Sequence, residues 1–260
     1  MRYSHSRIEC YEGCPYKYDL RYVQKLKTLP TDDAASPLII GTAMHTGIEK
    51  DVKTAIKEYF MSFPIITDAH IIEAMKLEVM IPKVKKLIQD TCKGKLTFEY
   101  ELKTSTFIGY LDLLEEVTPD YCNIYDFKYS NNEEHYLESR QLHIYKYETE
   151  KNTNYKVLNL NYIMIPKVSI KQKKTETELE FKQRLMKELD KAEPYLSPVQ
   201  YDIQKVINHK ELIENIENNR SLEKNTTSLC PRFCEYYNYC KSNGKIDYDI
   251  IYPEDIKIGK

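Results

Sequence analysis

The sequence lacks the marks of an exported, membrane-spanning or broadly basic protein. Its 260 residues contain no charged segment followed by an apolar leader, and no apolar stretch approaches the roughly 18 residues that a membrane-spanning helix needs. We therefore expect no membrane partner and a cytoplasmic, intracellular location. The formal net charge of −2 gives no overall basic character, so any surface for nucleic acid has to be a local patch.

The composition is otherwise that of an ordinary globular protein. Hydrophobic residues make up 42% and charged residues 30% of the chain, which is long enough to bury a sizeable core as one large domain, or as one domain with a small appendage. Seven cysteines in a chain expected to stay inside the cell favour metal or cluster ligation over disulfide bonds.

The spacing of apolar residues predicts a mixture of helices and strands. Helices are expected in two short pieces on either side of Cys14, and then over Gly41–Phe60, Asp68–Cys92 with an interruption near Pro82, Glu133–Lys151, Glu176–Glu193 and Tyr201–Asn218. Strands are expected over Leu96–Lys103, Phe107–Val117, Cys122–Tyr129 and Tyr155–Pro166. This order predicts a mixed α/β core that is wrapped by helices.

The two central strands carry charges at positions where apolar side chains would be usual. A turn at Thr118-Pro119-Asp120 separates them, which predicts a β-hairpin. Because side chains alternate along a strand, Asp126 and Lys128 share one face, and Asp112 lies on an otherwise apolar face of the preceding strand. Burying these charges is costly unless they pair with one another or bind a cation. The hairpin therefore predicts a divalent-metal site suited to hydrolysis of phosphodiester bonds.

Individual roles follow from the chemistry of these side chains. Asp112 and Asp126 would hold the cation, and His45, on the apolar stripe of its predicted helix, would add a nitrogen ligand that favours Mn²⁺ over Mg²⁺. Lys128 would position the attacking water or stabilise the charge of the pentacovalent phosphate. Each residue alone has an ordinary interpretation, as a surface ion pair or as a core histidine. Their joint occurrence in a fixed order is what indicates a site.

A second group of candidate ligands lies at the two ends of the chain. Cys230, Cys234 and Cys240 are closely spaced, and four such soft ligands suit either Zn²⁺ or an iron–sulfur cluster. Cys14 is the preferred fourth ligand, with Cys10 second. A third interpretation, reduced thiols without a metal, is less favoured. The remaining two cysteines have no partner at ligand spacing and are expected to be buried apolar residues, namely Cys92 and Cys122.

Four short motifs follow one another along the chain: Gly41-Thr-Ala-Met-His45, Gly109-Tyr-Leu-Asp112, Asp126-Phe-Lys128 and Gln141-Leu-His-Ile-Tyr145. Their order resembles that of the PD-(D/E)XK nuclease superfamily, and within it the RecB-like branch, which includes the RecB and AddB nuclease domains and CRISPR-associated and phage-encoded exonucleases. The resemblance implies the metal ligands His45, Asp112, Asp126 and the carbonyl of Phe127. It implies catalytic roles for Lys128, Asp112, Asp126, Gln141 and Tyr145. Either Glu99 or Glu101 could occupy an acidic position that the family often carries.

The resemblance also implies an architecture. It predicts a restriction-endonuclease-like central mixed β-sheet flanked by helices, with a nuclease core at about residues 37–195 of a single domain spanning 1–260. An iron–sulfur subdomain would be formed by residues 1–30 and 196–245. Iron–sulfur members of the branch hold a [4Fe–4S] cluster, which implies the ligands Cys14, Cys230, Cys234 and Cys240. The family usually separates the first two C-terminal cysteines by two residues, whereas three separate them here, so zinc and Cys10 stay open as alternatives.

The expected function is that of a metal-dependent DNA nuclease in recombination, repair or replication, acting in the host cytoplasm if phage-encoded. Because no separate reading module such as a helix-turn-helix is apparent, an exonuclease acting on single-stranded DNA or DNA ends is favoured over a sequence-specific enzyme. Expected DNA contacts are Gln141, Tyr145, Lys171, Lys173 and Lys174, although such a basic run is more often a solvated loop. A helicase or recombination protein is the expected kind of partner. The alternative is a non-catalytic iron–sulfur module of the same fold that binds DNA or a helicase.

Overall fold

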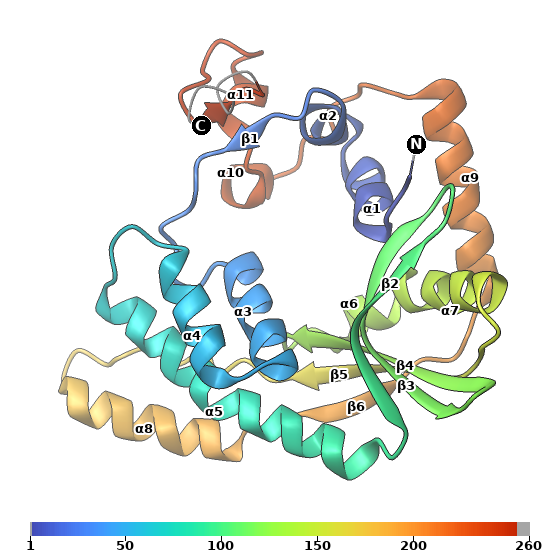
Figure 1. Cartoon of the computed structure of the whole chain (residues 1–260). Coiled ribbons are helices and arrows are strands. Elements are labelled where there is room, and N and C mark those ends of the chain that lie inside the picture. The colour runs from blue at the N-terminus through green and yellow to red at the C-terminus, as the bar shows by residue number, and fades with distance from the viewer. Residues whose placement is uncertain (1, 254–260) are drawn as a thin grey trace. The chain divides into compact units, whose positions relative to one another are not determined.

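A five-stranded mixed sheet lies at the centre of one of the two units into which the chain divides (Figure 1). The structure, a computed structural model, describes residues 2–253. The sheet unit consists of residues 31–103 and 109–202, and the second unit of residues 2–30, 104–108 and 203–253. Among the residues described, no helix is both long and apolar enough to cross a membrane.

The strand order of the sheet is β2-β3-β4-β5-β6. The strands are β2 (Lys95–Lys103), β3 (Ile108–Thr118), β4 (Tyr121–Tyr129), β5 (Lys156–Ile165) and β6 (Tyr195–Pro198). The predicted hairpin is confirmed because β3 and β4 pair antiparallel, while β4 and β5 pair parallel and β5 and β6 antiparallel. The sheet is therefore mixed, as the sequence predicts. Strand β6 was not expected.

Helices cover both faces of this sheet. They are α3 (Pro37–Glu49), α4 (Val52–Met61), α5 (Asp68–Thr91), α6 (Glu133–Leu137), α7 (Gln141–Asn152) and α8 (Glu178–Lys191). The main core forms where α3, α4, α5 and α8 pack on one face, which presents Tyr125, Phe127 and Ile163. The alternating residues Asp126 and Lys128 therefore point to the opposite face, against which α7 packs. The two faces of β4 thus separate the main core from the side chains of Asp126 and Lys128.

Two predicted helices are each broken into two by local capping. The helix predicted over Gly41–Phe60 is interrupted after α3 because the side chain of Asp51 accepts a 2.8 Å hydrogen bond from the Thr54 N–H and starts α4. The helix predicted over Glu133–Lys151 is likewise split into α6 and α7. Here the hydroxyl of Ser139 accepts a hydrogen bond from the backbone N–H that begins α7.

The predicted interruption of a helix near Pro82 is wrong. Helix α5 runs through this residue for 24 residues. A proline inside a helix loses one hydrogen bond and costs about 3 kcal/mol. Its neighbours Met80, Ile81 and Val84 are fully buried in the main core, and this packing outweighs the local preference.

The second unit joins the two ends of the chain. Its elements are α1 (His5–Gly13), α2 (Pro15–Tyr18), the π-helical turn η1 (Asp19–Val23), β1 (Lys27–Thr28), α9 (Ile203–Asn219), α10 (Cys230–Phe233), α11 (Tyr237–Lys241) and β7 (Ile250–Ile251). As predicted, α1 and α2 meet at Cys14. Strands β1 and β7 pair antiparallel, and Leu20 packs with Tyr236 and Ile250 in one apolar cluster. This unit therefore holds segments more than 200 residues apart in the sequence.

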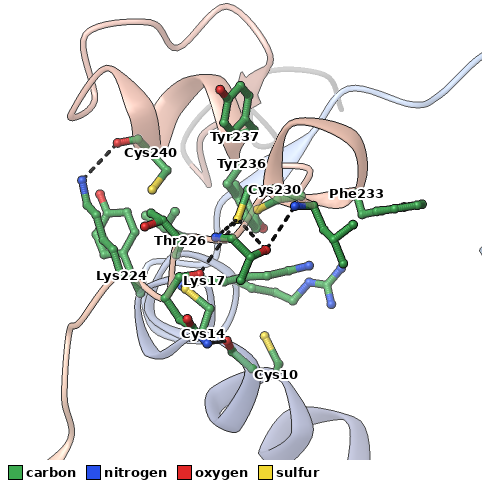
Figure 2. Close-up of a pocket in the computed structure, with 18 of the residues that line it drawn as sticks. Cys10, Cys14, Lys17, Lys224, Thr226, Cys230, Phe233, Tyr236, Tyr237 and Cys240 are labelled. Carbon is green, nitrogen blue, oxygen red and sulfur yellow. Dashed lines mark hydrogen bonds between the residues drawn. The ribbon is translucent and has the colours of Figure 1, made fainter. Parts of the chain in front are cut away.

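A cavity of about 830 Å³ lies inside this second unit (Figure 2). The cysteines that line it are Cys10, Cys14, Cys230, Cys234 and Cys240. The two cysteines outside the cavity, Cys92 and Cys122, are buried, as expected for apolar residues.

Candidate active site

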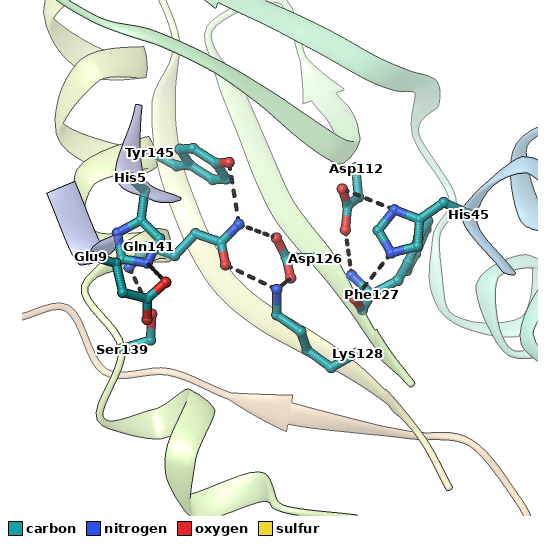
Figure 3. A network of polar contacts seen from close by, with 10 residues as sticks. All are labelled: His5, Glu9, His45, Asp112, Asp126, Phe127, Lys128, Ser139, Gln141 and Tyr145. Atoms are coloured by element: carbon teal, nitrogen blue, oxygen red, sulfur yellow. Dashed lines mark hydrogen bonds and ion pairs between the residues drawn. The ribbon is translucent and has the colours of Figure 1, made fainter. Parts of the chain in front are cut away.

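A closed network of polar contacts joins strand β4 to helix α7 (Figure 3). Lys128 Nζ lies 2.6 Å from Asp126 Oδ2 and donates a 2.9 Å hydrogen bond to Gln141 Oε1. Gln141 Nε2 donates in turn to Asp126 Oδ1 at 2.8 Å and to the hydroxyl of Tyr145 at 3.2 Å. Because Gln141 and Tyr145 are four residues apart on one helix, they share a face and reach the strand together. The two ends of the Gln141 amide thus fix both the lysine and the aspartate.

Two buried carboxylates stand side by side on the central hairpin. Leu113 pairs with Tyr125, so the antiparallel register places Asp112 opposite Asp126. Asp126 is only 1% exposed and Asp112 8%. Burial and the negative charge of Asp112 together raise the pKa of Asp126 to about 6, although Lys128 opposes this shift. The two carboxylates therefore repel each other in the protein interior.

His45 on α3 reaches the same place from the other helical layer. Its Nδ1 lies 3.4 Å from Asp112 Oδ1, and its Nε2 lies 3.3 Å from the carbonyl oxygen of Phe127. Burial lowers the pKa of His45, but the hydrogen bond to Asp112 and the charges of both aspartates outweigh it and raise the pKa to about 9. The two carboxylates thus stabilise the protonated form of the His45 ring.

Strand β2 contains a residue in the left-handed conformation, Glu99. This residue has a φ of +49°, a left-handed conformation that is strained for a side chain of this kind. Ligand atoms of Glu99, His45 and Asp112 all lie within 4.8 Å of one another. The other acidic residue left open by the sequence, Glu101, instead accepts a 3.0 Å hydrogen bond from the Tyr110 hydroxyl. The strained position therefore brings Glu99 into the site.

These residues fit a divalent cation. Oxygen and imidazole donors of Glu99 on β2, Asp112 on β3 and His45 on α3 converge, and this donor set suits Mn²⁺ or Mg²⁺. Asp126 on β4 is not part of this group of three. Asp126 Oδ2 is buried and pairs with the Lys128 ammonium at 2.6 Å. A bound cation would offset the repulsion between the two aspartates.

Lys128 is the fixed cation of the site. Burial acts to lower the pKa of Lys128, but the charges of Asp126 and Asp112 outweigh it, and the net shift is upward. The ammonium also lies over two aromatic rings, 5.2 Å from the centroid of Tyr136 and 5.6 Å from that of Tyr162. Neither tyrosine was singled out from the sequence, because 23 tyrosines make any one of them an uninformative signal.

The cysteine cavity of the second unit has its own electrostatic character. Figure 2 shows Cys14, Cys230 and Cys240 turning their sulfurs toward a common space. Burial raises the pKa of Cys240, Lys224 opposes this, and the charges of Cys14, Cys234 and Cys230 add to it. The cations that line the cavity are Lys17, Arg21, Lys224 and Lys241. A cavity with cationic walls and several thiols suits a group that binds thiolates and carries negative charge.

The basic run lies apart from this network of polar contacts. Lys171, Lys173 and Lys174 are exposed on the connection between β5 and α8. Arg184 on α8 donates to the carbonyl oxygen of Lys171, and Lys171 also lines a cavity of about 680 Å³ with Glu73 of α5. These contacts place the run beside α5 and α8, the helices that cover the face of the sheet opposite Lys128.

A mixed sheet that presents paired aspartates and a lysine on adjacent strands defines a class of metal-dependent nucleases. The chain belongs to this class: a family model of the PD-(D/E)XK nuclease superfamily matches residues 2–241. A solved structure from Eubacterium rectale, described as a "putative exonuclease", is similar in fold, with a TM-score of 0.53 and 12% sequence identity over 100% of this chain and 94% of that chain. No curated protein matches the chain. The predicted superfamily and fold class are confirmed.

Proposed function

We propose that this protein is a DNA exonuclease that hydrolyses phosphodiester bonds in single-stranded DNA or at DNA ends. The observation that carries the proposal is the position of Lys128, whose ammonium contacts both Asp126 and Gln141 beside the group of His45, Glu99 and Asp112. A nuclease needs metal-binding carboxylates next to a fixed positive charge, and this site provides both. The exonuclease assignment draws on the description of the similar structure from Eubacterium rectale.

In the proposed mechanism, Asp112, Asp126, His45 and the carbonyl of Phe127 would hold a divalent cation, together with Glu99. When bound, that cation would supply charge neutralisation at the scissile phosphate and a more acidic bound water. The ammonium of Lys128 stabilises the negative charge that develops on the phosphate, and stays protonated because two aspartates face it.

Gln141 and Tyr145 support this arrangement from helix α7. The Gln141 amide holds Asp126 and Lys128 at a fixed separation, so that each keeps its orientation while DNA binds. The Tyr145 hydroxyl accepts a hydrogen bond from Gln141 and fixes the rotation of the amide. We propose that Lys171, Lys173 and Lys174 contribute a further, electrostatic attraction for the DNA backbone, although they do not line the site.

We further propose that the second unit is an iron–sulfur subdomain formed by about residues 1–30 and 196–245, attached to a nuclease core at about residues 37–195. A [4Fe–4S] cluster would be held by Cys14, Cys230, Cys234 and Cys240. Four thiolates around one Zn²⁺ would lie about 3.8 Å apart, given Zn–S bonds of about 2.3 Å. A zinc site held by the same thiolates is the alternative.

The setting that fits this activity is recombination, repair or replication of DNA inside a cell, with a helicase or recombination protein as the partner. This part of the proposal draws on the RecB-like motifs around Asp112, Lys128 and Gln141. It would be supported by co-purification of the full chain with such a protein.

The activity is tested with purified protein and Mn²⁺ or Mg²⁺ on single-stranded DNA labelled at its 5′ or 3′ end. We expect mononucleotides or short products from one end, and a fall of at least about 100-fold in the single-turnover rate for Lys128→Ala, as for loss of one stabilising charge in other enzymes. The exposed Lys156→Ala serves as a control. Equal rates for the wild type and Lys128→Ala would favour the alternative, a non-catalytic DNA-binding module, over an enzyme acting through Lys128.

A further inference from the structure

Two tyrosine rings lie beside the ammonium group of Lys128, with their centroids 5.2 Å (Tyr136) and 5.6 Å (Tyr162) from Nζ. Tyr162 belongs to β5, is paired with Asp126 in the parallel ladder, and is fully buried. Tyr136 belongs to α6 and is half-buried. The two ring centroids lie 5.8 Å apart at an angle of 52°. Lys128 therefore has aromatic faces as neighbours in addition to Asp126 and Gln141.

The short helix α6 is held in place from both of its ends. The side chain of Asn132 accepts a hydrogen bond from the His135 N–H and starts the helix. On the first turn, Glu133 accepts a 3.1 Å hydrogen bond from the hydroxyl of Tyr195 on β6. At the other end, the backbone N–H of Ser139 donates to the carbonyl of Tyr136. The ring of Tyr136 is thus presented to Lys128 by an anchored element.

An ammonium group over the face of an aromatic ring is attracted by the negative charge of that face, and more so when water is excluded. The side chain of Lys128 is only 17% exposed, so water gives it little hydration. The ion-pair partner of Lys128, Asp126, is also a proposed metal ligand. A bound metal would compete for the Asp126 carboxylate, so the lysine needs a further restraint. The ring faces restrain the ammonium without accepting its protons, which leaves the N–H group that Asp126 and Gln141 do not bind available for the phosphate.

We propose that Tyr136 is a positioning residue that holds the ammonium of Lys128 through the face of its ring. The inference rests on the proposed function and extends it to a residue outside the four sequence motifs. This positioning role requires the aromatic ring of Tyr136 and not its hydroxyl group. Tyr162 contributes in the same way, but it is fully buried, so its replacement would also disturb the core.

The kinetic test compares Tyr136→Leu with Tyr136→Phe, and uses Tyr121→Leu, at the exposed start of β4, as a matched control. A lost cation–π contact of partly buried groups predicts a fall in kcat of about tenfold for Tyr136→Leu. The KM for single-stranded DNA should stay within about twofold, because the ammonium acts on charge that develops in the transition state. Tyr136→Phe keeps the ring and should retain most of kcat. Equal loss in Tyr136→Phe and Tyr136→Leu, or unchanged kcat in Tyr136→Leu, overturns the proposal.

A second measurement does not depend on cleavage. A ring face beside the lysine shifts the NMR signals of the Lys128 Cε methylene protons upfield, and these signals can be assigned from their absence in Lys128→Arg. We expect the full upfield shift in the full-length wild type and in Tyr136→Phe, and a smaller one in Tyr136→Leu, in which only the ring of Tyr162 remains beside the lysine. An unchanged shift in Tyr136→Leu, or an unshifted signal in the wild type, overturns the proposal. If the wild type and Lys128→Ala cleave DNA at equal rates, the proposed function fails, and the methylene shift still decides whether Tyr136 holds Lys128.

Discussion

Asp112 accepts a 2.7 Å hydrogen bond from the backbone N–H of Phe127, the residue between Asp126 and Lys128. One carboxylate oxygen of Asp112 is thereby fixed to the neighbouring strand, and the other faces His45 at 3.4 Å. The same side chain therefore has a structural role through Oδ2 and an electrostatic one through Oδ1. Substitutions can separate the two roles.

We expect Asp112→Asn to abolish cleavage while the protein stays folded. The amide oxygen of asparagine can still accept the hydrogen bond from Phe127, but the negative charge that attracts a cation is lost. Asp112→Ala should lose the hydrogen bond as well, and leave a buried N–H without a partner at a cost of about 1–3 kcal/mol. Thermal unfolding measures the stability of both variants, and calorimetric titration with Mn²⁺ measures the metal affinity. Tight Mn²⁺ binding by Asp112→Asn would contradict the assignment.

The two glutamates of β2 provide a matched pair for the metal site. Glu99 lies with His45 and Asp112, whereas Glu101 bonds to an exposed tyrosine. We expect Glu99→Gln to weaken Mn²⁺ binding by at least about tenfold, the lower end of what even an outer partner contributes to a metal site. Glu101→Gln should leave the affinity unchanged. Titration of both variants with Mn²⁺ checks this, and equal affinities would exclude Glu99 as a ligand.

The sequence predicted the hairpin and most of its polar residues because both follow from local rules. Alternation along β4 places Asp126 and Lys128 on one face, and the helix period brings Gln141 and Tyr145 together. Alternation also places the two buried carboxylates of β3 on opposite faces. Asp112 lies at the site, whereas Glu115 accepts hydrogen bonds from two backbone N–H groups and two side chains and has a structural role.

What the sequence missed depends on contacts between distant residues or on local strain. The choice of Glu99 over Glu101 follows from a positive φ that no periodicity reveals. The uninterrupted helix through Pro82 depends on burial in the main core. The position of Tyr136 depends on the break between α6 and α7, since a continuous helix would place the ring differently. Tertiary packing decided the helix through Pro82, whereas local backbone conformation and capping decided the other two features.

The raised pKa of His45 predicts how stability depends on pH in the metal-free protein. Since the folded-state pKa is about 9 and the unfolded value about 6.5, His45 contributes stability that is fully present below about pH 6.5 and is lost as the pH rises toward 9. We expect the melting temperature to fall across this window, by an amount equivalent to at most about 3 kcal/mol. His45→Gln should flatten the decline, whereas replacement of the exposed His135 should not.

Metal binding should have the opposite pH dependence. A histidine must lose its proton to become a ligand, so the affinity for Mn²⁺ should rise by up to about tenfold per pH unit between pH 6.5 and 9. Titrations at several pH values measure this, and His45→Gln should show a smaller rise. An affinity that is independent of pH in the wild type would exclude His45 as a ligand.

Single substitutions can show which of the two N-terminal cysteines of the cavity, Cys10 or Cys14, is the fourth ligand. Cys14 caps α2 through a hydrogen bond that its sulfur accepts from the Lys17 N–H, and its charge acts on Cys240 of the C-terminal group. We expect Cys14→Ser to lose iron and the absorbance near about 400 nm, and Cys10→Ser to retain both. Cys14→Ser should also lower the melting temperature, because the cluster would link chain segments more than 200 residues apart. Loss of iron in Cys10→Ser alone would assign the fourth ligand to Cys10, and a colourless wild type that contains zinc would replace the cluster with a zinc site.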